Sequence, residues 1–212
     1  PVTVYGGFGV EYIVNAFNAV YAADEAYRIA HHGEEIFPVE LLATASTILE
    51  VGPEGRVIYD ADGVSVLAFK VDHSPVGVAL GYRVEYLGKV VGVSGDTIDT
   101  AGLRALSANA DVLVSDVMNK SLVEETECAF GRIPETRFEK IFRDIRTYHI
   151  DVTEVAEVAR DAEVATLVMT HLVPASDNPA QLDLAFRQPV SSIYNGTVIV
   201  AEDGTEVVIP IQ

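Results

Sequence analysis

Lys89-Val-Val-Gly-Val-Ser-Gly-Asp96 is the stretch that decides the fold, because an apolar strand here ends in a glycine turn that exposes a carboxylate. Two further apolar runs end on an imidazole. Leu67-Ala-Phe-Lys-Val-Asp leads to His73, and Val164-Ala-Thr-Leu-Val-Met-Thr leads to His171. Strand ends lie at the rim of a sheet, and imidazole with carboxylate suits zinc and similar divalent ions. The sequence therefore predicts a metal site made from strand ends.

Length and composition favour one large domain over residues 1–212. The 212 residues are 49% apolar, which allows a sizeable core and excludes disorder. No apolar run reaches the roughly 18 residues that span a bilayer, and the first residues have no signal-peptide pattern. The single cysteine, Cys128, excludes internal disulfides and fits a reducing compartment. We expect a cytoplasmic protein with no membrane partner, in which Cys128 is a spectator.

The charge balance disfavours one large class of partners. The chain has 32 acids and 14 bases, a formal net charge of −18. Such a surface repels phosphate backbones and argues against nucleic acid as a partner. The acids are spread along the chain except at Glu124-Glu-Thr-Glu127, so we expect most of them on a solvated face. This balance favours a small-molecule substrate.

The pattern changes along the chain from strands to alternating helices and strands. Residues 10–30 have helical spacing, and residues 40–93 read as antiparallel strands joined by short turns. Beyond Asp96, buried strands are expected at 111–116 and 164–170, with a terminal hairpin at 197–210. Helices are expected at 100–109, 134–148, 153–161 and 179–187. The fold class is therefore α/β.

Each candidate ligand also has an ordinary structural interpretation. A lone histidine after a strand, such as His73, is more often a surface or core residue than a ligand. The turn at Asp96 also reads as an Asx turn or an N-cap. His171 follows a wholly apolar strand, so we expect it to be buried and to need a partner.

Four other residues carry chemistry with more open roles. His149 precedes a helix and reads as a neutral hydrogen-bonding group, a general acid or a simple helix-entry side chain. Asp116 follows a buried strand and is a candidate supporting or structural acid. His31 and His32 are adjacent, and neighbouring side chains diverge, so a polar turn is favoured over a chelating pair.

Taken together, the motifs resemble one family. They occur in the order Val71-Asp-His-Ser-Pro, Val93-Ser-Gly-Asp-Thr, Ala110-Asp-Val-Leu-Val-Ser-Asp, His149 ahead of Val155-Ala-Glu-Val-Ala, and Leu167-Val-Met-Thr-His-Leu. This order resembles the C-terminal two-thirds of a metallo-β-lactamase-fold hydrolase. The nearest branch holds ribonuclease Z, related phosphodiesterases and arylsulfatase-like enzymes. The resemblance implies an αββα sandwich, here without its N-terminal strands.

The resemblance assigns roles to four residues. His73 matches a ligand of the first metal, Asp96 the carboxylate that bridges two metals, and His171 a ligand of the second metal. His149 matches a histidine that assists proton transfer to the leaving group, so Asp96 and His149 are the catalytic candidates. The implied cofactors are two divalent ions, zinc first, with manganese or iron as alternatives.

The chain also departs from the family pattern. The His-x-His-x-Asp-His motif is absent, and we expect it upstream of Pro1 in a longer protein. The alternative is a degenerate, non-catalytic homologue that acts as a binding protein. A redox enzyme of the related di-iron flavoprotein branch would need further acidic ligands and a flavin domain.

The resemblance implies a metal-dependent hydrolase that uses a hydroxide held between two metals. Transfer-RNA processing members carry a long basic arm between the first histidine and the bridging aspartate, whereas only 22 residues lie between His73 and Asp96. We therefore expect a small phosphodiester, sulfate ester, phosphonate or lactone as substrate, with ribonuclease Z-like RNA processing as the alternative. Branch members are often homodimers, and residues 124–148 read as a dimer contact or a lid. The sequence leaves open the substrate, the native metal and the oligomeric state.

Overall fold

The structure is a computed structural model that describes residues 2–38, 43–132 and 136–211. It divides into two compact units, residues 1–50 and residues 51–212, which are described separately. The expectation of one domain over 1–212 stays a prediction. No helix among the described residues is both long and apolar enough to cross a bilayer.

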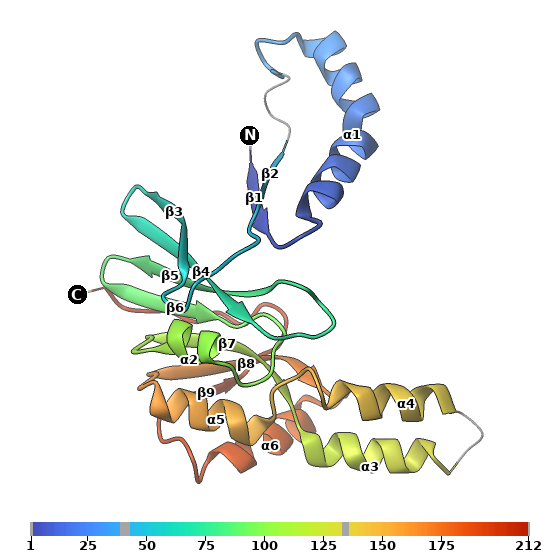
Figure 1. The fold of residues 1–212 in the computed structure, drawn as a ribbon, viewed down its shortest axis with the longest axis vertical. Coiled ribbons are helices and arrows are strands. Elements are labelled where there is room, and N and C mark those ends of the chain that lie inside the picture. The colour runs from blue at the N-terminus through green and yellow to red at the C-terminus, as the bar shows by residue number, and fades with distance from the viewer. Residues whose placement is uncertain (1, 39–42, 133–135, 212) are drawn as a thin grey trace. The chain divides into compact units, whose positions relative to one another are not determined.

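The first unit is a strand, a long helix and a second strand. Strand β1 (Thr3–Gly6) leads into helix α1 (Val10–His32), and β2 (Thr44–Thr47) pairs parallel to β1 (Figure 1). The helix ends at Gly33, whose backbone N–H donates to Ile29 O, as expected of a glycine C-cap. The antiparallel expectation is wrong for β2, because a helical crossover returns the chain to the end at which β1 began. Residues 40–42 of that expected strand lie outside the described residues.

The second unit contains a seven-stranded sheet in the order β3-β4-β5-β6-β7-β8-β9 (Figure 1). Neighbouring strands from β3 to β6 pair antiparallel, and neighbouring strands from β6 to β9 pair parallel. Tight turns suffice for antiparallel neighbours, whereas the parallel strands need helical crossovers. The strands are β3 (Arg56–Ala61), β4 (Val64–Val71), β5 (Ala79–Tyr86), β6 (Lys89–Val93), β7 (Val112–Met118), β8 (Thr166–Val173) and β9 (Thr197–Val200).

The connections between the parallel strands contain the helices of the second unit. They are α2 (Ala101–Ser107) after β6, α3 (Lys120–Phe130), α4 (Thr136–Ile145) and α5 (Val152–Asp161) after β7, and α6 (Pro179–Val190) after β8. Helices α2, α5 and α6 share one buried cluster with the sheet, to which Leu106, Val155 and Phe186 contribute from the helices and Leu113 and Leu167 from the strands. Full burial of side chains of this size stabilises the fold by about 1.5–3 kcal/mol each. The core therefore fixes the strands whose ends carry the site.

Two further elements differ from those that the sequence predicts. Helix α3 is not expected from the sequence, because its acidic run hides the apolar spacing. It is held by the Asn119 side chain, which accepts a hydrogen bond from Leu122 N, and by stacking of Phe130 on Phe142 in α4. The expectation of a terminal hairpin is also wrong. A turn forms where Thr205 N donates to Glu202 O, but residues 205–211 form no strand.

Candidate metal centre

Asp96 is placed by the turn that follows β6. Gly95 has φ +62°, a backbone conformation that glycine adopts at little cost. A Cβ at Gly95 would lie 2.8 Å from the Leu80 carbonyl oxygen, so the space also excludes a side chain. The glycine expected before the aspartate is therefore required twice, once by conformation and once by packing.

Two hydrogen bonds hold the loop that carries His73 against the loop that carries Asp96. Asp72 N donates to Thr97 Oγ1 at 3.1 Å, and Ile98 N donates to Asp72 O at 3.1 Å. Thr97 is completely buried. These two bonds hold the end of β4 against the segment after Asp96, so the loops that carry the two candidate ligands are joined directly.

His171 reaches the site through a β-bulge. Strand β8 continues to Val173, but its register with β7 shifts so that Thr170 faces Asp116 and Leu172 faces Val117. His171 is the extra residue of the bulge. Its φ is +45°, and a positive φ is uncommon for residues other than glycine. The expectation of a buried His171 is wrong, since 53% of its side chain is exposed. The bulge turns the imidazole out of the alternation of the strand and towards the rim.

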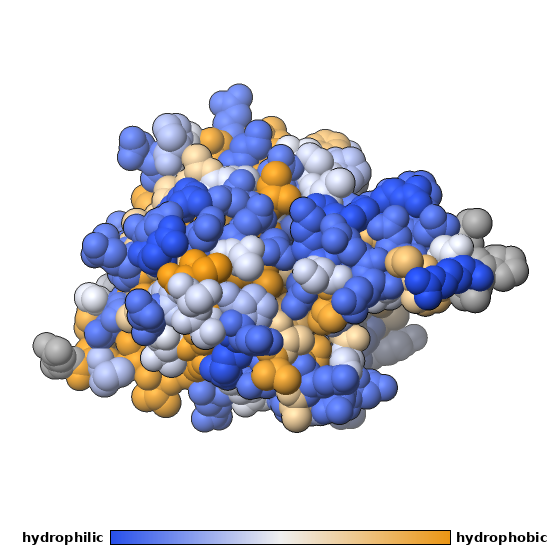
Figure 2. All heavy atoms as spheres, turned by 90° about the horizontal axis from the view of Figure 1, so that it is seen from below, coloured by the Kyte–Doolittle hydropathy of each residue, from blue (hydrophilic) through white to orange (hydrophobic). Residues whose placement is uncertain are grey.

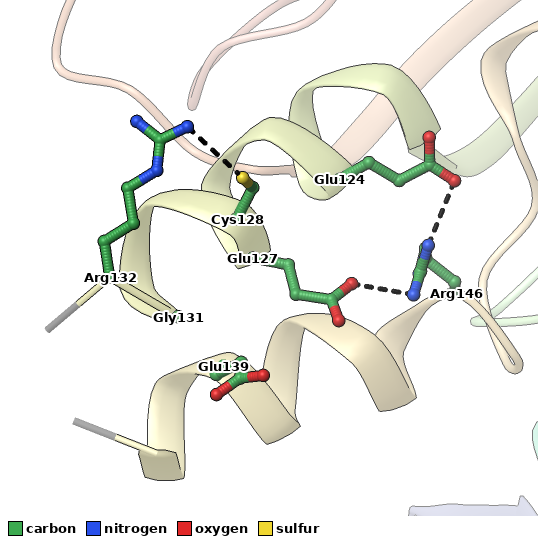
Figure 3. A pocket seen from close by; sticks show the side chains of 7 residues that line it. All are labelled: Glu124, Glu127, Cys128, Gly131, Arg132, Glu139 and Arg146. Carbon is green, nitrogen blue, oxygen red and sulfur yellow. Dashed lines mark hydrogen bonds and ion pairs between the residues drawn. The ribbon is translucent and has the colours of Figure 1, made fainter. Parts of the chain in front are cut away.

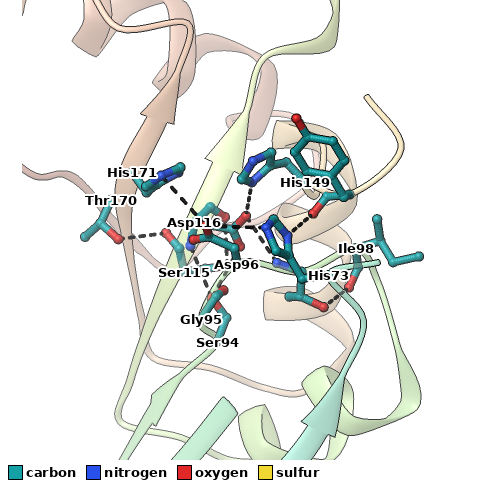
Figure 4. Close-up of polar contacts among 12 residues, drawn as sticks. His73, Ser94, Gly95, Asp96, Ile98, Ser115, Asp116, His149, Thr170 and His171 are labelled. Atoms are coloured by element: carbon teal, nitrogen blue, oxygen red, sulfur yellow. Dashed lines mark hydrogen bonds and ion pairs between the residues drawn. The ribbon is translucent and has the colours of Figure 1, made fainter. Parts of the chain in front are cut away.

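The Asp96 carboxylate lies between two imidazoles. Its Oδ2 is 3.9 Å from His73 Nε2 and 3.8 Å from His171 Nε2 (Figure 4). Two ligand atoms of one tetrahedral zinc lie about 3.4 Å apart, given metal–ligand distances of about 2.1 Å. The observed separations exceed this by a few tenths of an ångström. The donor set and its spacing therefore fit divalent ions on either side of Asp96.

Behind the ligands lies a buried histidine–aspartate pair. His149 Nδ1 is 2.9 Å from Asp116 Oδ2, and both residues are buried. Burial raises the pKa of Asp116, and the contact with His149 opposes that rise. The Asp116 carboxylate also accepts a hydrogen bond from Thr97 N at 3.4 Å. Because a carboxylate accepts, Nδ1 of His149 carries the hydrogen and Nε2 is left for the site.

The imidazoles of the centre pack against one another. His149 stacks on His171 with ring centroids 5.2 Å apart and meets His73 edge-on at 5.1 Å. His73 Nδ1 lies 2.9 Å from the Tyr148 carbonyl oxygen. The structure thus brings together all four residues expected from the sequence.

Two groupings of these residues are geometrically close. Ligand atoms of His73, Asp96 and His149 lie within 4.8 Å of one another, whereas the short contacts of Asp96 Oδ2 are to His73 and His171. We favour the second grouping for metal binding, because its two contacts of Asp96 Oδ2, at 3.9 Å and 3.8 Å, are close to the spacing of two ligands on one ion. The first grouping is what a proton donor beside a metal would also produce.

Other candidates from the sequence lie on other elements of the chain. His31 and His32 are exposed at the end of α1, in the first unit. Cys128 is exposed and lines a hollow of about 590 Å³ between α3 and α4 (Figure 3). In that hollow Arg146 pairs with Glu124 and Glu127, so the charges are matched internally. Two acids of the run Glu124–Glu127 therefore form ion pairs within the α3–α4 hairpin.

Sequence reasoning missed three contributors to the site. Ser94 accepts a hydrogen bond from Asp116 N at 3.2 Å, and Thr97 contacts both Asp72 and Asp116. Their position beside Asp96 was the available signal. Tyr148 contributes a backbone carbonyl, for which the sequence carries no signal beyond its position next to His149.

The comparisons with known sequences point to one family. No family model matches the chain. It is 39% identical over 175 residues to ribonuclease Z of Mycolicibacterium paratuberculosis, a match that covers 82% of this chain and 56% of that protein. It is 34% identical over 203 residues to a putative ribonuclease Z of Mycobacterium tuberculosis, covering 96% of this chain and 82% of that protein. The chain thus spans a little over half of the first relative and most of the second.

Solved structures show the same fold at low sequence identity. Human tRNase Z, short form, matches with a TM-score of 0.58 and 17% identity, over 100% of this chain and 68% of that chain. Zinc-bound PqqB from Methylobacterium extorquens matches with a TM-score of 0.57 and 19% identity, over 99% of this chain and 65% of that chain. The metallo-β-lactamase-fold protein YhfI from Bacillus subtilis matches at 0.51 and 19%, over 76% and 54%.

The expected α/β fold class and family are therefore confirmed. The motifs around His73, Asp96 and His171, the sheet order and the curated relatives agree. The chain belongs to the ribonuclease Z family and has the metallo-β-lactamase fold.

Proposed function

We propose that the whole protein is a two-metal hydrolase of a phosphodiester or similar ester, and that this chain supplies part of its metal centre. The observation that carries the proposal is the Asp96 carboxylate, whose Oδ2 lies 3.9 Å and 3.8 Å from two imidazole Nε2 atoms. A single carboxylate oxygen between two imidazoles suits a ligand shared by two ions. In this proposal His73 would hold one ion and His171 the other, and the placement of Asp96 between them supports it.

Bound divalent ions supply Lewis acidity and lower the pKa of coordinated water towards neutrality. Zinc is the first choice because imidazole and carboxylate are among its usual ligands. Manganese and iron are the alternatives. His73, Asp96 and His171 would hold the ions, and the hydrogen bonds between the His73 and Asp96 loops would keep these ligands in place.

His149 is the proposed proton donor to the leaving oxygen. Asp116 accepts from Nδ1, fixes the orientation of the ring and stabilises its protonated form, so that Nε2 can carry the transferred proton. Stacking on His171 keeps this nitrogen beside the ligands. Asp116 acts through His149 and is a positioning residue.

A small ester is the first candidate substrate. The net charge of −18 disfavours the binding of long phosphate backbones. The face in Figure 2 shows hydrophilic side chains spread among smaller apolar patches. The β4–β5 connection has no room for a long basic arm, because β4 ends at Val71 and β5 begins at Ala79. Both features support a phosphodiester, sulfate ester or lactone of limited size.

RNA processing is the second candidate. It is favoured by the relatives at 34–39% identity, which are named ribonuclease Z. Relatives of this kind are compatible with a net charge of −18, since a local basic surface can outweigh an acidic total. A non-catalytic binding protein is the outcome if no ester is cleaved. The cytoplasmic location and the homodimer stay predictions.

One assay separates these candidates. The whole protein is loaded with zinc or manganese and given a chromogenic phosphodiester, an aryl sulfate, a lactone and an RNA with a 3′ extension. We expect the small phosphodiester to be cleaved fastest, with weak dependence on salt. Faster RNA cleavage that declines steeply with salt would establish the second candidate. No cleavage of any substrate by fully metal-loaded protein would refute the hydrolase proposal.

A further inference from the structure

Tyr148 contacts two of the four site residues but is itself neither a ligand nor an acid or base. Its carbonyl oxygen is 2.9 Å from His73 Nδ1, and the next residue along the chain is His149. A carbonyl oxygen only accepts, so His73 Nδ1 must carry the hydrogen. In the neutral ring Nε2 is then unprotonated, and this is the nitrogen that faces Asp96. The contact therefore selects the tautomer that can bind a metal.

The aromatic ring of Tyr148 packs against the same two imidazoles. Its centroid is 5.1 Å from that of His73, with the rings nearly perpendicular, and 4.9 Å from that of His149. His73 and His149 are themselves 5.1 Å apart, so the three rings are mutually in contact. Among the described residues, the contacts of Tyr148 with the site come from its carbonyl oxygen and its ring and none from its hydroxyl. The ring, rather than the hydroxyl, is the part that acts on the site.

Hydrogen bonds link the residues of the centre to one another through their neighbours. His73 is tied to Tyr148, His149 to Asp116, and Asp116 to Thr97 N beside Asp96. One short segment, residues 148–149, thus orients a proposed ligand of the first metal and the proposed proton donor together. Losing its packing should disturb metal affinity and proton transfer at once.

We propose that Tyr148 is a positioning residue, whose ring packing holds its carbonyl on His73 and thereby fixes the metal-binding tautomer of His73 and the orientation of His149. The inference rests on the proposed function only for the use of the metal centre. The tautomer itself is a property of the metal-free protein and can be measured without any substrate.

The test compares Tyr148→Ala, Tyr148→Leu and Tyr148→Phe in the whole protein. Nitrogen-15 spectra of the imidazoles, with His73 assigned through His73→Gln, report the tautomer in the metal-free state. We expect the wild type and Tyr148→Phe to keep hydrogen on Nδ1, and Tyr148→Ala to show a mixture of tautomers. Zinc affinity, measured against a competing chelator, should fall about 10- to 100-fold in Tyr148→Ala, as for other partners of metal ligands.

Controls separate positioning from general stability. Tyr86→Ala removes an exposed tyrosine at the end of β5 and should change neither the tautomer nor zinc affinity. Tyr148→Leu keeps apolar volume if Tyr148→Ala fails to fold, and should show the same tautomer change. An unchanged His73 tautomer in Tyr148→Ala or Tyr148→Leu would overturn the inference, as would a loss in Tyr148→Phe equal to that in the other two variants. If no ester is cleaved but the tautomer changes as expected, the hydrolase proposal fails and the inference stands.

Discussion

His149 Nδ1 lies 2.9 Å from Asp116 Oδ2, and the two buried residues are 33 positions apart in the sequence. Burial raises the pKa of Asp116, which means that keeping this carboxylate ionised costs stability. A strained carboxylate of this kind, held against an imidazole at the site, is typical of a group kept for catalysis.

Asp116→Asn should lower activity without lowering stability at neutral pH. The amide keeps the shape of the carboxylate but cannot stabilise a charged imidazolium, so we expect kcat to fall about 100-fold. Removing the cost of a buried charge should leave the free energy of unfolding at pH 7 equal to that of the wild type or higher. Steady-state kinetics and urea unfolding measure the two effects. A large loss of stability together with the loss of activity would point to a structural acid.

The stability effect of Asp116 should depend on pH. A carboxyl whose folded pKa is raised contributes stability that is fully present below its unfolded pKa of about 3.9 and is lost as pH rises through the folded pKa. The Asn variant has no such dependence at this position. We therefore expect the variant to gain on the wild type as pH rises from 4 to 7, measured as the difference in unfolding free energy. A constant difference across this range would contradict the raised pKa.

His149→Gln should slow the reaction according to the leaving group. A poor alcohol needs a proton from His149, so its hydrolysis should fall about 100- to 10,000-fold, whereas a nitrophenolate ester should fall much less. Metal content should stay that of the wild type. His32→Gln, at an exposed histidine in the first unit, is the matched control. Loss of metal in His149→Gln would instead make His149 a ligand.

Gly95→Ala should damage both the fold and the site, and Gly88→Ala is its control. Both glycines have positive φ, +62° and +73°, and alanine there costs about 1–2 kcal/mol. Only at Gly95 would the new Cβ also meet a backbone carbonyl, at 2.8 Å, whereas no atom lies within 4 Å at Gly88. We expect a larger loss of unfolding free energy in Gly95→Ala, and weaker zinc binding in that variant alone. Equal losses in the two variants would show that the close approach to Leu80 is unimportant.

Much of this arrangement can be predicted from local sequence. The alternation of short strands and turns gives β3 to β6, and apolar runs flanked by helical spacing give β7 and β8. Glycine before Asp96 indicates a sharp turn at a strand end, and the structure has that turn. Period and turn chemistry act over a few residues, so they are visible in a single chain.

The rest depends on contacts that a linear pattern does not encode. The bulge at His171 arises from the register between β7 and β8, so the sequence alone predicted a buried side chain where an exposed one is found. The carbonyl of Tyr148 could belong to any residue type, since backbone oxygens are common to all. Helix α3 is stabilised by packing on α4, which its acidic sequence conceals.

Zinc binding by His73→Ala and His171→Ala tests the central claim most directly, with His31→Ala as the control at an exposed histidine of the first unit. We expect each of the two variants of the centre to lose zinc affinity by more than about 100-fold, beyond the loss typical of partners that only orient a ligand. His31→Ala should bind zinc like the wild type. If His73→Ala and His171→Ala keep the zinc content and affinity of the wild type, the carboxylate between the two imidazoles is not a metal centre.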